Sequence, residues 1–444
     1  MNTVAQDRFA TTKAHFKQLF EQFEQGLNGQ KAHPIHKLRR TAIQRLEDLQ
    51  FPGRKNEDWK YTPVTRVLQP AYKSAALANL TSADVEAHLF EGLDVHLLVF
   101  NNGKLDQTLS NIGELPEGVE ISTIATALDK GTHKEKIEGV LKGWAEGKDA
   151  FAALNMSFAD NGLFIYVPAN VQVEKPIYLL HLNLTASSPF LNNPQRIILA
   201  ERSSNCTIIE RYSNENSNGT YFTNAMTHID LGANAFFTHY KLQQESLESF
   251  QVNQVDVLQE RDSTYTSHAI DLGGRLVRNN LRTHLKNSGT LTNFYGVYLA
   301  KGEQHLDNQT FIDHAFPHCN SNELYKGVID DKARGVFNGK VIVRQDAQKT
   351  NAFQQNSNLV LSDKAVMDTK PQLEIFADDV KCSHGATIGQ LDEESIFYLR
   401  SRGLNKEAAR SLLQQAFLKE VIENMDIEPI REVVESMITK KFES

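Results

Sequence analysis

The feature that most constrains this fold is a stretch of more than 200 residues, starting near Phe151, that holds many short strand-like runs and no long helical pattern. These runs are rich in β-branched and aromatic residues and alternate with turns of Asn, Asp, Gly and Ser, as in "LFIYVP", "RIILAE", "AFFTHYKL" and "KVIVRQ". Consecutive strands without intervening helices indicate a sandwich, a barrel or a β-solenoid.

A weak internal repeat favours the solenoid. A polar tight turn followed by a strand recurs at intervals that are mostly near 30 residues, with one longer gap. Repeats of this length are typical of stacked units, each of which buries its apolar face against the next. We therefore predict a mainly β fold with a parallel β-helix core. The repeated segments are "ERSSNCTII", "LGANAFFTH", "ERDSTYTSH", "NSGTLTNFY", "DKARGVFNG" and "SDKAVMDTK".

Helical patterns flank this core on both sides. Near the N-terminus, Phe9, Phe16 and Phe23 recur at near-helical spacing, and a second amphipathic segment runs from His36 to Leu49. The predicted organisation is an N-terminal helical region over 1–90, the β-helix core over 91–388 and a C-terminal helical region over 389–444.

The C-terminal region carries clear helix signals. Asp392 and Asn405 stand where N-caps are expected, and Gly403 stands where a helix-ending C′ glycine is expected. A last helix is predicted to start near Glu428–Pro429, because proline is well tolerated in the first turn.

Composition excludes several classes of partner and location. The 444 residues include 40% hydrophobic and 23% charged residues, and the formal net charge of −8 offers no general basic surface for nucleic acid. No apolar run approaches the roughly 18 residues that a membrane span needs, and the N-terminus shows no secretory signal. Cys206, Cys319 and Cys382 are few and scattered, which fits a reducing cytoplasm.

Several common catalytic motifs are absent from the sequence. It contains no G-x-x-x-x-G-K-[ST] loop, no G-x-G-x-x-G, no H-E-x-x-H, no G-x-S-x-G and no Cys-x-x-Cys pair. We therefore predict that the chain alone hydrolyses no nucleotide, and no autonomous zinc or iron–sulfur site can be identified.

The stretch "DDVKCSHGAT" places Cys382 and His384 two residues apart at the end of the β-rich region. If the strand continues through Cys382, both side chains face the same side, and a thiolate with an imidazole suits zinc or iron. Two ligands do not complete a tetrahedral site, so distant residues or another chain would have to supply the rest. A buried cysteine beside a structural histidine, and a catalytic cysteine–histidine dyad, are the alternatives.

A second dense group lies in "EQHLDNQTFIDHAFPHCNS". Its spacing is irregular, which favours turn and surface polar residues over metal ligands. Cys206 is expected to be a small core residue. The residues of the second group are His305, Asp307, Asp313, His314, His318 and Cys319.

These segments resemble the SufB/SufD family of iron–sulfur cluster assembly proteins, and within it the SufD branch. The resemblance is carried by "DDVKCSHGATIGQLDEESIFYLRSRGL", by "RKNEDWKYTPV" at Arg54–Val64, and by "FAALNMSFADNGLFIYVPANVQVEKPIYL" and "VFNGKVIVRQDAQKTNAFQQNSNLVLS". It covers almost the whole chain. Gly385 stands where the SufB branch typically has an acidic residue.

The resemblance implies a right-handed parallel β-helix between helical ends and a scaffold rather than an enzyme. It implies that the chain assembles with SufB and with the SufC ATPase, which is held by the C-terminal helical region. The last coil of a solenoid presents an unpaired strand edge unless it is capped, so we expect pairing there with SufB, or with a second copy of the chain when SufB is absent. It places His384, with Cys382, near a SufB interface as a candidate ligand for iron or a nascent cluster. No cofactor would be bound stably by the isolated chain, because the iron or cluster would be transient and shared with SufB.

The alternative from a different class is a carbohydrate lyase or hydrolase built on a β-helix, with Asp378 and Asp379 as paired acids. Adjacent residues on a strand face opposite sides of the sheet, which is poor geometry for an acid/base pair acting on one bond. The absence of a secretory signal also disfavours a polysaccharide substrate.

Overall fold

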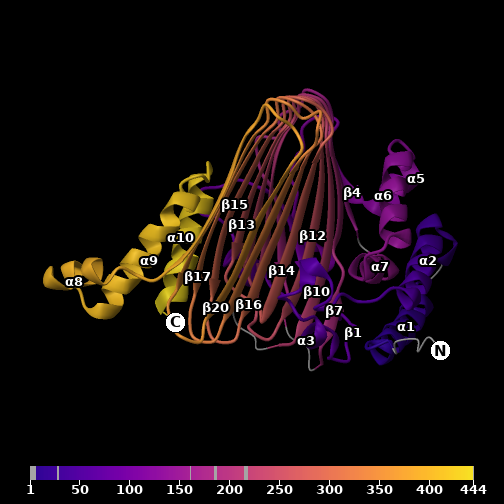
Figure 1. The fold of residues 1–444 in the computed structure, drawn as a ribbon. Helices are drawn as coiled ribbons and strands as arrows, with labels where there is room; N and C mark the ends of the chain where they lie inside the picture. Colours follow the sequence, from indigo (N-terminus) through magenta and orange to yellow (C-terminus); the bar gives the residue numbers. More distant parts are fainter. Residues whose placement is uncertain (1–6, 28–29, 161, 185–187, 215–218, 444) are drawn as a thin grey trace, which may run out of the picture.

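The computed structural model describes residues 7–27, 30–160, 162–184, 188–214 and 219–443. Its centre is a parallel β-solenoid in which each coil of the chain adds one strand to each of two sheets (Figure 1). The predicted mainly β fold with helical ends is therefore confirmed. Among the described residues, no helix is both long and apolar enough to cross a membrane.

The first sheet is built mainly from even-numbered strands. All neighbours from β5 onward along the solenoid axis pair in parallel, and β4 adds an antiparallel strand at the start. The strands are β4 (Glu120–Thr123), β5 (Leu163–Val167), β8 (Gln195–Ala200), β10 (Tyr221–Leu231), β12 (Phe250–Gln259), β14 (Leu276–Leu285), β16 (His305–His314), β18 (Arg334–Val343) and β20 (Val366–Ile375), with β1 (Lys73–Ser74) and β7 (Phe190–Asn192) beside β10.

The second sheet contains the other strands of the same coils, and its strands are odd-numbered from β9 onward. It starts with an antiparallel hairpin and ends on β21, which pairs with β19. The strands are β3 (Lys104–Asn111), β2 (His96–Asn101), β6 (Ile177–Leu182), β9 (Asn205–Ser213), β11 (Phe236–Gln244), β13 (Thr264–Asp271), β15 (Leu291–Ala300), β17 (Asn320–Ile329), β19 (Asn351–Val360) and β21 (Lys381–Gly389).

The coil length explains the repeat in the sequence. Leu276 pairs with His305, and His305 pairs with Arg334, so equivalent residues of these coils lie 29 positions apart. The longer gap arises because the first four repeated segments start in turns that lead from the first sheet to the second, whereas the last two start in turns that lead back. The repeated segments of the sequence therefore lie on two different edges of the solenoid.

The turns from the first sheet to the second share one backbone shape. Ser203, Asn234, Asp262 and Lys349 adopt positive φ angles of 58°, 57°, 58° and 60°. Such turns usually favour Gly or Asn, and here the stacking of coils supports them. The Ser203 amide donates to the Ala233 carbonyl at 2.9 Å, and the Asn234 amide donates to the Arg261 carbonyl at 2.8 Å. Backbone hydrogen bonds therefore hold each turn against the equivalent turn of the next coil.

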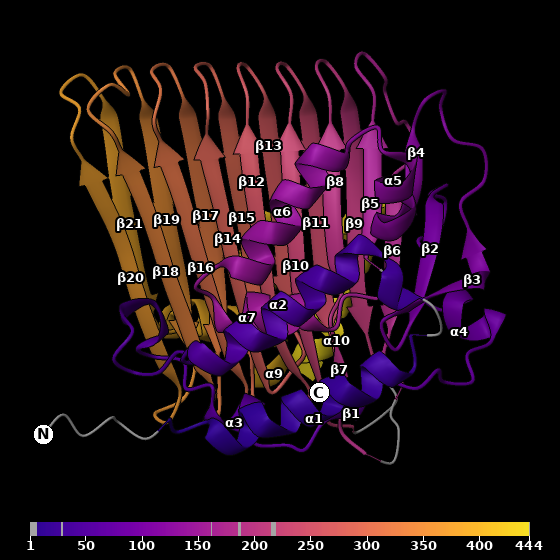
Figure 2. The ribbon, with the colours of Figure 1, turned by 90° about the vertical axis from the view of Figure 1, so that its right-hand side faces the viewer.

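Two helical layers cover the outer faces of the sheets (Figures 1 and 2). The N-terminal helices and an inserted group after β4 pack against the early strands of the first sheet. The C-terminal helices α9 and α10 pack against the second sheet. The helices are α1 (Ala10–Gln25), α2 (Pro34–Asp48), α3 (Thr65–Leu68), α4 (Ser82–Glu86), α5 (Ile124–Lys130), α6 (Lys134–Glu146), α7 (Ala150–Ser157), α8 (Glu393–Ser401), α9 (Lys406–Ile422) and α10 (Glu428–Glu443).

The predicted C-terminal helix signals are confirmed. The Asp392 side chain accepts from the Ser395 amide, and the Asn405 side chain accepts from the Ala408 amide. Gly403 has a φ of 98°, the left-handed conformation that ends α8. These caps separate α8 from α9 by a tight turn, so α8 can project away from the solenoid (Figure 1).

Close packing between coils leads to a stability test. A Cβ placed on Gly296 in β15 would lie 2.1 Å from ring carbons of Tyr325 in the next coil, whereas a Cβ on Gly385 in β21 would meet open space. We expect Gly296→Ala to lower the free energy of unfolding by about 1–3 kcal/mol, because the buried ring has to shift. Gly385→Ala is the matched control and should change little. Equal denaturation midpoints for the two variants would contradict this packing.

Candidate functional site

Cys382 and His384 lie on β21, the last strand of the second sheet. The strand does continue through Cys382, as the same-face prediction required. In the parallel register, Cys382 pairs with Ala352 of β19 and His384 pairs with Gln354. Ala352 and Gln354 are buried on the solenoid interior, and Cys382 packs against the interior core. By the two-residue period, His384 faces the same interior side.

The coil that carries this pair is the open end of the solenoid. β20 and β21 pair with strands on one side, and in Figure 2 they lie at the end of the stack away from α5 and α6. Most of β21, including His384, is exposed. Large apolar side chains are exposed there as well: Phe376 by 63%, Ile388 by 53% and Ile375 by 41%. Both an unpaired strand edge and apolar surface are therefore available at this end.

Gln354, the β19 residue that pairs with His384, forms a buried polar pair with Glu323 of β17. Gln354 donates from Nε2 to Glu323 Oε1 at 3.1 Å, and the Thr310 hydroxyl donates to the other Glu323 oxygen at 2.6 Å. Gln354 is only 3% exposed, and its Oε1 has no hydrogen-bond partner. Because the carboxylate holds the amide nitrogen, the free carbonyl oxygen is the group left for a neighbour such as His384. Burial raises the pKa of Glu323 to about 7.

The two side chains of the pair differ in environment. Cys382 is half-buried, and burial raises the pKa of its thiol, which disfavours the thiolate that binds soft metals. His384 is exposed. Of the two, His384 is therefore the more accessible ligand. Cys206 and Cys319 are fully buried, and the expected core role of Cys206 is confirmed.

The second polar group does not form one site. His305 and Asp307 lie at the start of β16, and Asp313 and His314 lie at its other end. Asp313 accepts from Arg344 at 2.7 Å, and His314 contacts the Ser321 hydroxyl at 2.9 Å. Among the described residues, no three or more His, Cys, Asp or Glu side chains gather as a metal would need.

The sequence predicts that the two acids of the alternative hydrolase hypothesis lie on a strand, but they do not. Asp378 and Asp379 follow β20 in the turn before β21, rather than on a strand, and both are exposed. Asp379 forms an ion pair with Lys349 of the preceding coil. Nothing in this arrangement places two carboxyl groups on opposite sides of one substrate bond.

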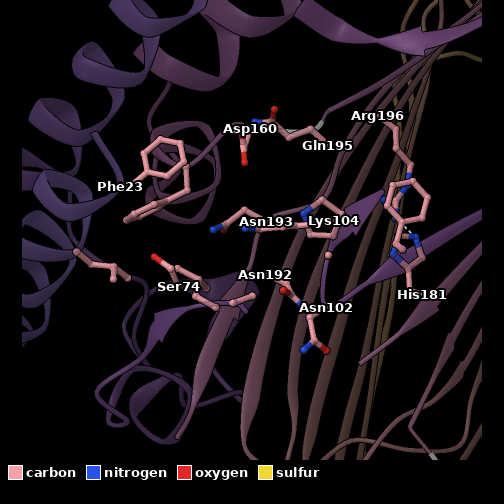
Figure 3. Close-up of a pocket in the computed structure, with 17 residues that line it drawn as sticks. Phe23, Ser74, Asn102, Lys104, Asp160, His181, Asn192, Asn193, Gln195 and Arg196 are labelled. Carbon is pink, nitrogen blue, oxygen red and sulfur yellow. Dashed lines mark hydrogen bonds between the residues drawn. The ribbon is translucent and has the colours of Figure 1, made fainter. Parts of the chain in front are cut away.

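A cavity of about 100 Å³ lies at the other end of the molecule, between the N-terminal helices and the first coils (Figure 3). Arg196 lies 2.8 Å from His181 Nε2 and 3.2 Å from Glu210 Oε1. Burial, followed by the nearby Arg196 charge, holds the pKa of His181 well below its usual value. The buried Arg196 charge is thus balanced by Glu210. A polar cavity of this size suits a few water molecules.

Two family models match this chain. Residues 183–417 match the model described as the SufBD core domain of SUF system FeS cluster assembly, and residues 10–179 match the SufBD protein N-terminal region. The chain belongs to the SufBD family of iron–sulfur cluster assembly proteins. The two matches together cover most of the chain.

Full-length relatives carry the same family name or the SufD name. A SufBD family protein of Synechocystis is 35% identical over 397 residues, covering 88% of this chain and 87% of the relative. SufD of Escherichia coli is 33% identical over 403 residues, covering 90% and 91%. SufD of Bacillus subtilis is 30% identical over 421 residues, covering 92% and 94%.

Sequence reasoning missed Gln354 and Glu323 as neighbours of His384. A signal was present, because Glu323, Gln354 and His384 lie 31 and 30 positions apart, one coil each. Alignment of the coils by their turns would have placed the three in one row.

Thiol accessibility gives a direct test of this geometry. We expect iodoacetamide to modify the folded chain at Cys382, while Cys206 and Cys319 stay unmodified, as read by mass spectrometry of the digested protein. The rate should keep rising with pH beyond the midpoint of an unstructured cysteine peptide, because a raised pKa delays thiolate formation. Modification of Cys206 or Cys319 at a similar rate would contradict their burial.

Proposed function

We propose that this chain is a non-catalytic scaffold subunit of a SUF-type iron–sulfur cluster assembly complex, working in the cytoplasm. The observation that carries the proposal is the open last coil, where His384 faces the solenoid interior on a strand with an unpaired edge. Iron or a nascent cluster is the cargo in this account, shared for a time with a partner rather than held as a resident cofactor.

The partner at the open coil is SufB, the other branch of the same family. An exposed strand edge pairs readily with another chain, and a solenoid that ends without a cap invites such pairing. The exposed Ile388 and Phe376 supply apolar contact around that edge. When SufB is absent, a second copy of the chain would occupy the same surface, because the edge offers the same backbone groups.

His384 is the proposed ligand from this subunit. Neutral imidazole binds iron, and a site completed by residues of two subunits would let a cluster form and then leave. The half-buried Cys382 thiol, with its raised pKa, is better suited to support the site than to dominate it. The need for ligands from SufB also fits the lack, among the described residues, of any cluster of three or more His, Cys, Asp or Glu side chains.

Gln354 is the proposed positioning residue for His384. Histidines that bind metals usually donate their second ring N–H to a carbonyl or carboxylate, which fixes the ring and its tautomer. The unpartnered Gln354 Oε1 is such an acceptor, and Glu323 holds the amide in the required orientation. Gln354 would thus orient the imidazole while the other ring nitrogen faces the cargo.

The C-terminal helices are the proposed attachment point for SufC. α9 is fixed to the solenoid through Lys326, which donates to the Phe417 carbonyl at 2.8 Å and pairs with Glu420 at 2.5 Å. α8 instead exposes Phe397 by 73% and Tyr398 by 56%. Because α9 is held against the solenoid and the adjoining α8 exposes two aromatic rings, this region suits protein docking. SufC would supply the ATPase, for which this sequence has no phosphate-binding loop.

The ligand role is tested in the complex with SufB and SufC. We expect His384→Ala to leave assembly intact and to reduce bound iron and sulfide strongly, Gln354→Leu to weaken iron binding about tenfold, and Cys382→Ser to do less. His318→Ala, an exposed histidine in a turn two coils further in, is the matched control. Full cluster yield and full maturation of a recipient apoprotein with His384→Ala would refute the ligand role.

The docking role of α8 is tested by surface substitution. We expect the double change Phe397→Ser and Tyr398→Ser to abolish co-purification of SufC and to leave SufB binding unchanged, because both rings are exposed on α8, which projects away from the solenoid. Leu77→Ser, at a residue exposed by 63% elsewhere, serves as the control. Retention of SufC at native affinity would show that α8 is not the attachment point.

A further inference from the structure

The segment Arg54–Val64, between α2 and α3, is fixed against the later coils of the solenoid (Figure 2). The Trp59 ring lies 3.7 Å from the Arg278 guanidinium of β14. The Thr62 hydroxyl lies 2.9 Å from His305 Nε2 of β16 and donates to Asp307. Glu57 forms an ion pair with Lys370 of β20. These contacts fix the backbone and leave other side chains of the segment facing outward.

The outward side chains line a groove of about 1100 Å³. One wall is the segment itself, with Arg54, Lys60 and Tyr61, and the opposite wall is formed by residues at the starts of β14, β16 and β18. The groove is remote in sequence from the Cys382–His384 pair. It is far larger than a single bound ion requires, so its occupant would be a molecule of several groups.

The charge of the groove is strongly one-sided. Seven Arg or Lys side chains line it, against one carboxylate, that of Glu303. Arg275 pairs with Glu248 and Glu303, and Arg334 pairs with Asp368. The other five form no ion pair with any described residue. They are Arg8, Arg54, Lys60, Arg66 and Lys332.

This concentration of charge is notable in a chain whose net charge is −8. Like charges around one groove repel one another, and the repulsion is relieved when an anion enters. Guanidinium groups match phosphate oxygens in a two-pronged geometry, and lysines add point charges. Arg275 immediately precedes β14 and Arg334 is the first residue of β18, and these strands lie two strand spacings apart, which is about 10 Å. The groove is therefore long enough for an anion with several charged groups.

We propose that this groove binds a small molecule that carries a pyrophosphate group, such as a nucleoside di- or triphosphate. A pyrophosphate concentrates several negative charges within a few ångströms, which matches five unpaired cations around one groove. An acidic peptide spreads single charges along its length and matches the arrangement less well. Half-buried Tyr61, which has Lys60 Nζ 5.3 Å from its ring centroid, offers an aromatic wall for the rest of the molecule. The site binds without hydrolysis, since no phosphate-cradling loop lies there.

Calorimetric titration of the full chain with inorganic pyrophosphate and with ATP tests the proposal. Both should bind, with affinity falling as salt is added, and Lys60→Glu should weaken binding at least tenfold. Lys332→Glu, on the opposite wall, should do the same, and Lys142→Glu, at an exposed residue of α6, is the matched control for charge reversal. Melting curves should show that all three variants stay folded.

Three results would overturn the proposal. The first is the absence of binding of either phosphate compound at millimolar concentration in low salt. The second is equal affinity for the wild-type chain and both groove variants. The third is an oligoglutamate peptide that binds as tightly as pyrophosphate, which would identify the groove as a docking surface for an acidic protein segment.

Discussion

Backbone hydrogen bonding from coil to coil is the interaction on which this structure depends. Each strand from β8 to β19 has a neighbour on both sides within its own sheet, so the amide and carbonyl groups of one coil are satisfied by the next. The exception to this pairing lies at the end of the stack. β21 has a neighbour on one side only, and the residues that the family resemblance singles out lie on that strand. The same ladder that stabilises the core therefore positions the site at its end.

The sequence predicted the parts of the fold that depend on local chemistry. The turn rhythm indicated a solenoid, because polar turns with positive φ recur once per coil, and Asp392, Gly403 and Asn405 marked the C-terminal helices through their capping chemistry. Placing Cys382 and His384 on one face required only the two-residue period of a strand. These features involve residues near one another in the chain.

Features that depend on long-range register were not predicted. The turn repeat in the sequence mixes two different edges of the solenoid, so it does not align Glu323, Gln354 and His384 as one row. Asp378 and Asp379, which the sequence predicts as adjacent strand residues, lie in a turn. The basic groove joins the Arg54–Val64 segment to coils more than 200 residues away, and no local pattern contains that pairing. Charge in the groove is also hidden by the acidic composition of the whole chain.

The central claim is that the open edge of β21 is a pairing surface that brings His384 against SufB. Amide hydrogen exchange of residues 381–389 tests it most directly, with the buried strand β13 as the internal reference. In a dilute monomer the alternate amides that point away from β19 should exchange quickly, because the strand lacks a second neighbour. In the complex with SufB they should become protected while β13 stays unchanged. Equal exchange of residues 381–389 in the dilute monomer and in a verified complex would contradict the account.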